Sequence, residues 1–520
     1  MGNATSNGQT WPERPARATV NTGEHGPRAP RSRPGLPRPA NRQRSGSGEM
    51  RKIDRTYIDG QFVTPHGTEL SPLFNPTTEE VIGEVRLADE TDARTATAAA
   101  KQAFASYSRT SKEERIALLN RLSVTFTERL DELKAAMVEE YGAVRGIVDG
   151  LIPLAPTMFA DAAKLLESYE FTKARGTSTV VMKPLGVAAL ITPWNLNTVF
   201  VAQKLANALA AGATAVVKPS ELSAIQTQIM TEAFDAADVP PGVINVVTGR
   251  GSIVGDVLTS HPDVTKVSFT GSTVVGQRIM RNAAATFKRL TLELGGKGPS
   301  ILLDDADIPS AVSAALSSGF LNNGQTCFAG TRILAPRSRL EEILEAIESA
   351  MPAFGVGDPR DPSTGVGPVV SQAQFDRVQS YIRLGLQEGA QLLVGGEGRP
   401  EGLDKGWFVK PTVFAGVTNQ MRIAREEIFG PVLVVIPYED DDEAVSIAND
   451  SPYGLQAHVF SSDTERAHHV ARQVEAGAVL INRIFSDVEA PFGGIKQSGI
   501  GREHHLYGLE SYLEPRAITA

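Results

Sequence analysis

The only cysteine of the chain, Cys327, lies in the polar segment Asn323–Cys327 rather than in an apolar stripe. A thiolate is a strong nucleophile, and an amide-rich loop is expected to help lower the thiol pKa below its free value of ~8.5. The alternative is a buried and inert thiol, the commoner fate of a lone cysteine. The segment by itself leaves both interpretations open.

Two more polar side chains adjoin expected buried strands. Glu293 lies in the apolar run Leu292–Leu294, which ends at two glycines, so desolvation is expected to raise its pKa and make it a usable base. A salt-bridged strand residue would look the same. Asn195 follows Thr192-Pro193-Trp194 and could polarise a carbonyl with its side-chain amide, although a turn asparagine is the simpler interpretation.

Two segments have residue types that suit a nucleotide. In Lys218–Glu221 a cation and a carboxylate could hydrogen-bond sugar hydroxyls, but a solvated charge pair is common after a strand. In Thr270–Gly276 the backbone amides and the dipole of an opening helix suit a diphosphate, with Gly271 allowing close approach and Ser272 expected to cap. This is not the G-x-G-x-x-G fingerprint, and a plain capped turn would look similar.

Short apolar strands alternating with helical segments must position these residues. The expected strands are Val187–Ile191, Ala213–Val217, Ile244–Val247, Val267–Phe269 and Leu290–Leu294. This alternation favours a doubly wound parallel sheet of the α/β class, in which ligands bind beyond the carboxyl ends of strands. A second alternating stretch from about Ala311 to Asn482 predicts a second α/β lobe.

Two local patterns near the start of the folded sequence are specific. Tyr57–Val63 reads as a hairpin around an Asp-Gly turn. Ser111 with Glu114 forms a capping-box signature, and apolar residues at helical spacing from Ile116 to Met137 predict one long amphipathic helix.

Length and composition bound the class of protein. A chain of 520 residues predicts two or three lobes, and 41% hydrophobic with 21% charged residues is ordinary for a soluble globular protein. We expect no membrane span, because no apolar run reaches ~18 residues. One cysteine permits no internal disulfide, and the pairs His468/His469 and His504/His505 cannot point the same way on a helix, so no structural metal is expected.

The first 49 residues differ from the rest, with eight Arg against three Glu and many Pro, Gly and Ser. They are expected to be disordered, with a basic interaction arm as the alternative, and Met50 is expected to be the natural start. They show no secretory or transit signal, so we expect a cytoplasmic protein. The remainder is more acidic than the whole chain's net charge of -9 and is a poor nucleic-acid partner.

Seven motifs in order resemble the aldehyde dehydrogenase superfamily from about residue 55 to the C-terminus. The motifs are Pro193-Trp194-Asn195, Lys218-Pro219-Ser220-Glu221, Phe269-Thr270-Gly271-Ser272, Glu293-Leu294-Gly295-Gly296-Lys297, Gly324-Gln325-Thr326-Cys327, Glu426-Glu427-Ile428-Phe429-Gly430-Pro431 and Pro491-Phe492-Gly493-Gly494. Their order along one chain makes chance assembly negligible, and it favours the functional interpretation of each motif.

The resemblance implies NAD(P)-dependent oxidation of an aldehyde to its carboxylic acid. Cys327 would be the nucleophile, Asn195 and the Cys327 backbone N–H would hold the oxyanion, and Glu293 would activate water; Lys204 and Glu503 would relay protons. The implied cofactor-binding residues are Thr192, Pro193, Trp194, Lys218, Ser220, Glu221, Gly251, Gly271, Ser272, Val275, Leu294, Gly295, Glu427 and Phe429. Glu221 favours NAD, since a carboxylate repels a 2′-phosphate, with NADP as the alternative.

The family fold implies a Rossmann-type cofactor domain at 50–165 and 185–293, a catalytic domain at 294–482, and bridging segments at 166–184 and 505–520 that pair subunits into dimers or tetramers. Side chains expected to shape the aldehyde pocket are Phe200, Gln203, Phe328, Phe485 and Phe492. Together they suggest an apolar tunnel with one polar handle at Gln203. One rival is a CoA-acylating semialdehyde dehydrogenase, which would lack the base; the other is a non-catalytic binding protein, which would have lost Cys327, Asn195 or Glu293.

Overall fold

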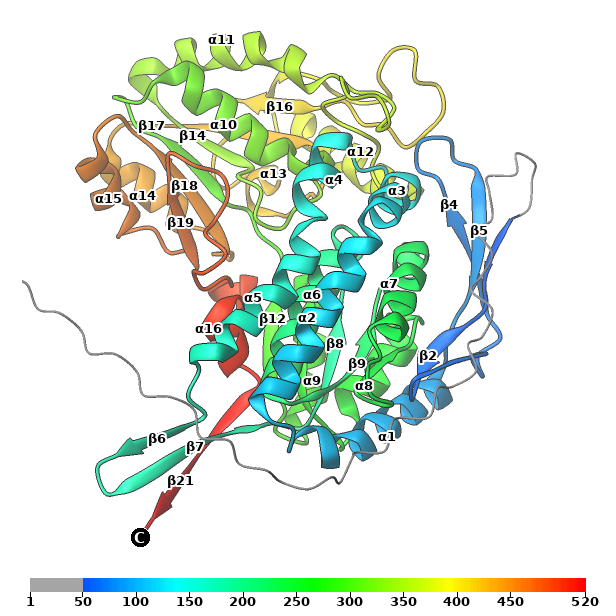
Figure 1. The fold of residues 1–520 in the computed structure, drawn as a ribbon. Coiled ribbons are helices and arrows are strands. Elements are labelled where there is room, and N and C mark those ends of the chain that lie inside the picture. Colours follow the sequence, from blue (N-terminus) through cyan, green and yellow to red (C-terminus); the bar gives the residue numbers. More distant parts are fainter. Residues whose placement is uncertain (1–49) are drawn as a thin grey trace, which may run out of the picture. The chain divides into compact units, whose positions relative to one another are not determined.

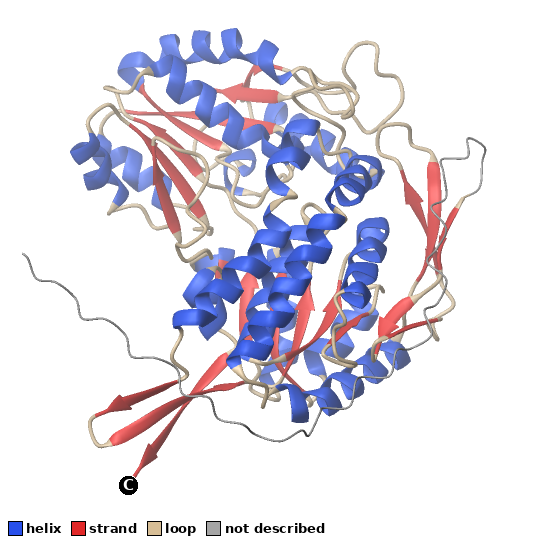
Figure 2. Ribbon diagram, in the orientation of Figure 1, coloured by secondary structure: helices blue, strands red, loops and turns tan. Residues whose placement is uncertain are grey.

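The computed structural model describes residues 50–520, which form four β-sheets with covering helices (Figures 1 and 2). The predicted disorder of residues 1–49 lies outside the described residues.

An eight-stranded sheet has the order β20-β12-β11-β8-β9-β10-β2-β3. Its strands are β2 (Thr56–Ile58), β3 (Gln61–Val63), β8 (Val187–Ile191), β9 (Thr214–Lys218), β10 (Ile244–Val246), β11 (Val264–Thr270), β12 (Arg289–Glu293) and β20 (Gly499–Ile500). The strands from β12 to β10 pair in parallel, which confirms the doubly wound sheet and all five predicted strands to within a few residues.

Helices cover both faces of this sheet, which explains why β8 and β9 are buried along their whole length and why β8 is entirely apolar. One face packs against α1 (Glu90–Tyr107), α8 (Asp256–Ser260) and α9 (Thr273–Ala284). The other face packs against α2 (Lys112–Glu128), α5 (Leu154–Ser168), α6 (Asn197–Ala211) and α7 (Ala224–Ala236), as Figure 1 shows around β8 and β9.

The prediction of one long helix from Ile116 to Met137 is wrong. The Ser111 capping box is present, but α2 ends at Glu128 and a separate helix, α3 (Leu130–Tyr141), follows. Arg129 joins them with φ −105° and ψ 8°, outside the helical region. Its guanidinium bonds to Glu132 of α3 and Glu232 of α7, contacts that fix the break but are invisible to periodicity.

The second α/β lobe is a seven-stranded sheet with the order β15-β16-β17-β14-β13-β18-β19. Its strands are β13 (Pro299–Leu302), β14 (Arg332–Pro336), β15 (Gln391–Val394), β16 (Thr412–Ala415), β17 (Val432–Tyr438), β18 (Gln456–Phe460) and β19 (Ala478–Ile481). The sheet begins at β13, before the predicted start at Ala311. This strand was not predicted because it is only four residues long and directly follows a Gly-Gly-Lys-Gly segment, which is not typical of a strand.

Alternate residues of these strands enter two cores. Ile333 of β14 packs with α10 (Ile308–Phe320) and α11 (Leu340–Ala350), whereas its neighbour Leu334 faces the opposite core. The helices of the second face are α12 (Gln372–Gln387), α13 (Arg422–Arg425), α14 (Asp441–Asn449) and α15 (Thr464–Ala471).

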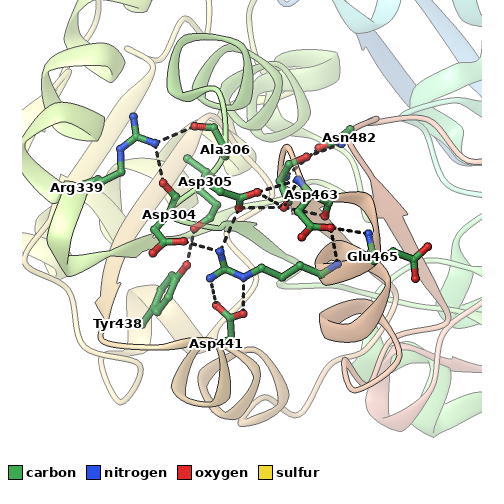
Figure 3. Close-up of polar contacts among 12 residues, drawn as sticks. Asp304, Asp305, Ala306, Arg339, Tyr438, Asp441, Asp463, Glu465 and Asn482 are labelled. Atoms are coloured by element: carbon green, nitrogen blue, oxygen red, sulfur yellow. Dashed lines mark hydrogen bonds and ion pairs between the residues drawn. The ribbon is translucent and has the colours of Figure 1, made fainter.

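Arg466 of α15 fastens the loop after β13 to α14. Its guanidinium contacts Asp304 at 2.6 Å, Asp305 at 3.3 Å and Asp441 at 2.7 Å, carboxylates that Figure 3 shows converging with these contacts. These hydrogen bonds raise the pKa of Arg466, so the cluster is a structural clamp between elements of the second sheet.

The Asp-Gly hairpin prediction is confirmed, since β2 and β3 pair antiparallel around Asp59 and Gly60, both at positive φ.

Two three-stranded sheets and two further α-helices complete the sheets and α-helices of residues 50–520. One small sheet has the order β1-β5-β4, from Arg51–Ile53, Val81–Arg86 and Leu70–Phe74. The other has the order β21-β7-β6, from Leu513–Thr519, Ser178–Pro184 and Thr172–Arg175. The helices are α4 (Arg145–Leu151) and α16 (His505–Glu510). The division into domains stays a prediction.

Within residues 50–520, no helix is both long and apolar enough to cross a membrane. The same residues contain no group of three or more His, Cys, Asp or Glu side chains arranged to hold a metal ion.

Candidate active site

A cavity of about 540 Å³ lies where elements of the two large sheets meet. It brings together many residues that the sequence singled out far apart in the chain. Those that line it are Pro193, Trp194, Asn195, Gly271, Ser272, Leu294, Gly295, Cys327, Glu427 and Phe429. Four other residues of the lining were not predicted, because no motif around them pointed to a ligand: Gln374, Arg377, Tyr381 and Tyr453.

The loop before Cys327 is held in an unusual backbone conformation. After α10, Asn322, Asn323 and Gly324 have φ values of 54°, 60° and 71°, three left-handed residues in succession. Asparagine and glycine tolerate this region best, which explains the Asn-Asn-Gly sequence. Gly324 is further required because a Cβ there would lie 2.2 Å from the carbonyl carbon of Gly430.

Hydrogen bonds to other parts of the chain hold the loop before Cys327 in place. The Tyr141 hydroxyl of α3 donates to the Asn322 carbonyl at 2.9 Å and accepts from Gln325 Nε2 at 2.9 Å. Asn323 Nδ2 donates to the carbonyls of Gly142 and Pro368 at 3.0 and 2.9 Å. The position of Cys327 therefore depends on α3 and on the segment before α12, neither of which the sequence analysis connected to it.

Asn195 is tied to the same loop. Its Nδ2 donates to the Gln325 carbonyl at 2.9 Å, while Asn322 Nδ2 donates to the Asn195 carbonyl at 3.0 Å. One amide hydrogen of Asn195 is thus used for positioning, and an NH₂ group has a second to offer. Asn195 and Cys327 both line the cavity, and the loop that ends at Cys327 is the one that holds Asn195.

The expectation of a lowered thiol pKa is wrong. Burial raises the pKa of Cys327 well above its usual range, and the nearby carboxylates of Glu427 and Glu293 raise it further. The backbone N–H groups of Cys327 and Phe328 act in the predicted lowering direction, but desolvation outweighs them. Cys327 is itself half-buried and lines the cavity, where a substrate could reach it.

Glu293 lies at the end of β12 and is 2% exposed. Neither carboxyl oxygen has a hydrogen-bond partner among residues 50–520. Burial raises its pKa well above the usual range, with the Glu503 carboxylate adding to the rise, which agrees with the predicted direction. A side chain is disfavoured at Gly493, where φ is +151°, because a Cβ there would lie 2.7 Å from the Gly501 carbonyl oxygen and 2.6 Å from Glu293 Oε1.

Lys204 and Glu503 meet in the core although they are about 300 residues apart. Lys204 Nζ of α6 lies 2.5 Å from Glu503 Oε1, and Gln203 Nε2 donates to Glu503 Oε2 at 2.8 Å. This pairing keeps the pKa of Glu503 lowered despite complete burial. The Glu503 carboxylate also acts on the pKa of Glu293, so the pair is coupled to the candidate base.

The segment Glu427–Phe429 forms another wall. Glu427 Oε1 accepts from the Gly296 N–H at 2.9 Å, and Gly295 leaves room that a Cβ would fill, 2.5 Å from Glu427 Oε2. Arg377 donates to the Glu427 carbonyl at 2.5 Å. Phe429 packs edge-on against Trp194, with 5.5 Å between the ring centroids. Burial raises the pKa of Glu427 to about 7.

Two predicted cofactor residues, Ser272 and Val275, lie at the start of α9. Ser272 occupies the N-cap position, but its side chain makes no capping hydrogen bond, so the predicted cap is wrong. Ser272 also lines the cavity. Val275 is exposed and is not among the lining residues, whereas the neighbouring Val274 is.

Several predicted cofactor residues lie outside this cavity. Lys218 Nζ lies 3.6 Å from Glu221, whose other oxygen lies 3.0 Å from Arg250 Nη1, a contact that sequence reasoning missed. The Ser220 hydroxyl accepts from the Leu222 N–H at 3.2 Å, and Thr192 Oγ1 donates to Asn197. Gly251 is exposed at the start of a short π-helical turn.

The residues expected to shape an aldehyde pocket are also distributed differently. Phe328 and Phe492 pack edge-on at 6.2 Å between ring centroids. Gln203, the expected polar handle, instead binds Glu503 and lines a second cavity of about 230 Å³ with Met158 and His505. Phe485 is 45% exposed, and Phe200 packs on the core around α6.

The model of the aldehyde dehydrogenase family matches residues 62–518. The chain belongs to the aldehyde dehydrogenase family. Membership makes the chain an oxidoreductase that oxidises aldehydes to acids, and it confirms the resemblance drawn from the seven motifs.

Relatives within the aldehyde dehydrogenase family match over nearly their full length. A 3-succinoylsemialdehyde-pyridine dehydrogenase from Pseudomonas sp is 47% identical over 473 residues, 90% of this chain and 99% of the relative. A crystal structure of a mutant aldehyde dehydrogenase C from Pseudomonas syringae with NAD⁺ and octanal has a TM-score of 0.88 at 44% identity, covering 90% of this chain and 96% of the other. A betaine aldehyde dehydrogenase from Staphylococcus aureus with NAD⁺ and a BME-modified cysteine has a TM-score of 0.87 at 37% identity, covering 89% and 96%.

Replacing Gly324 with alanine should disrupt the nucleophile loop. The new Cβ would clash with the Gly430 carbonyl carbon, and alanine would also be strained at positive φ, so we expect a loss of about 2–4 kcal/mol in the free energy of unfolding and a large fall in turnover. Denaturant unfolding and steady-state rates measure both effects.

Gly389→Ala is the matched control. Gly389 has φ +83°, but among residues 50–520 no atom lies within 4 Å of the position that a Cβ would occupy, so its alanine variant should lose only about 1 kcal/mol and keep full turnover. Equal losses in the two variants would contradict a specific role for the close approach at Gly324.

Proposed function

We propose that the chain oxidises a small-molecule aldehyde with NAD⁺, using Cys327 as nucleophile and Glu293 as the base that activates water. The observation that supports this most directly is that Cys327 and Asn195 line one cavity while the Glu293 carboxylate is near enough to act on the thiol pKa. Nucleophile, oxyanion donor and base come from three different elements, and hydrolytic aldehyde oxidation needs all three.

In the first half-reaction, the Cys327 thiol loses its proton to water in the cavity that it lines, and the sulfur then attacks the aldehyde carbon. The resulting oxyanion would accept hydrogen bonds from the Asn195 side-chain amide and from the Cys327 backbone N–H. Because Asn195 is held by the Gln325 carbonyl, this donor is oriented before the substrate arrives. Removing one such donor typically costs ~10²–10³ in rate.

The residues around the cavity fit NAD⁺, which when bound would accept the hydride that the tetrahedral adduct gives up as it becomes the thioester. The start of α9 offers free N–H groups to a diphosphate, and a side chain at Gly271 or Gly295 would fill the space left beside Phe269 or Glu427. Lys218 and Glu221 would bind the adenine-side ribose and Glu427 the other ribose. Similar structures were crystallised with NAD⁺.

NADP⁺ is a second candidate cofactor, favoured by Arg250. Its guanidinium lies 3.0 Å from Glu221 and lowers the pKa of that carboxyl group together with Lys218. A cation beside the ribose position offsets the repulsion that a carboxylate exerts on a 2′-phosphate.

In the second half-reaction, Glu293 takes a proton from water, and the resulting hydroxide attacks the thioester on Cys327. The sulfur leaves and the carboxylate product is released. A raised pKa makes Glu293 a stronger base than an exposed glutamate, so its reactive carboxylate form grows as the pH rises. The presence of this buried base argues against a CoA-acylating enzyme, and the intact Cys327 and Asn195 argue against a non-catalytic protein.

The proposal is tested by following cofactor reduction with aliphatic, aromatic and semialdehyde substrates, with NAD⁺ or NADP⁺ and with or without CoA. We expect turnover without CoA in the wild type and none in Cys327→Ala, whose smaller side chain has no nucleophile. A strict CoA requirement would indicate the acylating enzyme. No cofactor reduction with any aldehyde would indicate a binding protein.

Glu293→Gln should permit a burst of NADH but slow turnover by ~10²-fold or more, because acylation survives while deacylation lacks its base. Rapid-mixing absorbance separates the burst from the steady state. In the wild type the steady rate should rise with pH through the pKa of Glu293, and this rise should vanish in the variant. A normal steady-state rate in Glu293→Gln would remove it from the base role.

We also propose that the sheet β21-β7-β6 pairs subunits into a dimer or tetramer. Residues Arg516–Thr519 of its edge strand are exposed, including Ile518, and an uncovered edge strand readily pairs with another chain. Removing residues 513–520 should reduce the oligomer seen by sedimentation; an unchanged mass would place the interface elsewhere.

A further inference from the structure

A polar stripe runs through the otherwise apolar eight-stranded sheet. Alternate residues of β11 facing α6 are Lys266, Ser268 and Thr270, and those of β12 beside them are Thr291 and Glu293. The intervening Val267, Phe269 and Leu292 enter the apolar core on the opposite face. A stripe of five buried polar residues in the centre of a sheet is costly unless it serves a purpose.

The stripe is continuous with the Lys204–Glu503 pair. Ser268 Oγ donates to Glu503 Oε1 at 2.8 Å and accepts from Lys204 Nζ at 2.9 Å. In register, Thr270 lies opposite Glu293 and Ser268 opposite Thr291. The stripe therefore leads from the candidate base, past Glu503, toward the amino end of the sheet.

Lys266 stands at the far end of the stripe. It is 2% exposed, its Nζ lies 2.5 Å from Thr291 Oγ1, and it sits 5.2 Å from the ring centroid of Tyr512. Within the described part of the chain no carboxylate is hydrogen-bonded to it, unlike Lys204. A structural buried lysine would normally be paired with a carboxylate or several carbonyls.

We propose that Lys266 accepts the proton that Glu293 takes from water, by way of the Lys204–Glu503 pair, Ser268 and its register partner Thr291, whose hydroxyl contacts Lys266 Nζ. In each cycle the O–H bond of protonated Glu293 breaks and an N–H bond forms on neutral Lys266 Nζ, which then returns the proton to solvent. This inference rests on the proposed function. Lys266 acts through other groups and contacts neither substrate nor cofactor.

The charges around Lys266 suit an amine that changes protonation state. Lys204 of α6 repels its cationic form and Glu503 attracts it, while burial dominates and lowers the pKa of Lys266 to about 7. The Tyr512 phenol stays protonated because burial raises its pKa. Arg289 lies opposite Lys266 in register, but it is exposed and paired with Glu514 at 3.0 Å.

The test compares Lys266→Met and Lys266→Arg with wild type by burst kinetics and by turnover from pH 6 to 9. Both variants should keep the NADH burst, and turnover at high pH should fall by roughly tenfold, since neither side chain accepts a proton. Turnover requires both Glu293 and Lys266 to be unprotonated. Because the variants lack the amine of Lys266, their turnover should fall less steeply below pH 7. Lys266→Met should also unfold at an equal or higher temperature, since it removes a buried amine.

Lys288→Met is the matched control. Lys288 is another buried lysine beside the same strands, but its Nζ donates to the carbonyls of His261 and Val264 at 2.5 and 2.7 Å. Its removal leaves two carbonyls unpaired, so the melting temperature should fall while turnover and its pH profile stay those of wild type.

Wild-type turnover and pH profile in Lys266→Met would overturn the inference, as would loss of the burst in proportion to turnover. Should Lys266→Met fail to fold, Thr291→Val can be used instead, since it removes the hydrogen bond to Lys266 Nζ. In this variant the pH at which turnover falls should be lower than in wild type. An unchanged pH profile would contradict the relay. A wild-type enzyme without any Cys327-dependent burst would instead refute the proposed function.

Discussion

The left-handed turn before Cys327 is the constraint on which the candidate active site depends. Three successive residues at positive φ are strained, and the strain is sustained because Tyr141 and Asn323 fasten the turn by hydrogen bonds. Tyr141 ends α3, which packs near the first sheet, whereas Cys327 follows α10 of the second. The thiol is thus positioned by both halves of the folded chain, and Asn195 is fixed by the same loop.

Burial controls the chemistry of the site more than any single charge. It raises the pKa of Cys327 and Glu293 and lowers that of Lys266 to about 7, so in each group it disfavours the charged form. The carboxyl group of Glu503 is the exception to this pattern, because its hydrogen bonds to Lys204 and Ser268 lower its pKa and favour the charged form. Neutral groups make the dry core tolerable, and each becomes reactive by gaining or losing one proton.

The sequence predicted the main sheet well because its signals are local. A buried parallel strand is a short apolar run, and β8 matches its predicted bounds. The Asp59-Gly60 turn and the Ser111 capping box are likewise decided by neighbouring residues. The long helix failed at Arg129 because its break is fixed by Glu232 of another helix, a contact that apolar periodicity does not register.

The sequence by itself determined which residue types were available: one thiol, an acid in an apolar strand, an amide after a strand, and the order of motifs that marks the family. Tertiary structure alone decided their states and partners. It raised the pKa of the thiol, bonded Gln203 to Glu503 across 300 residues, and joined Lys266 to Thr291 of the stripe. The reason is that pKa values and buried hydrogen bonds depend on desolvation and on contacts across hundreds of residues, which spacing along the chain does not encode.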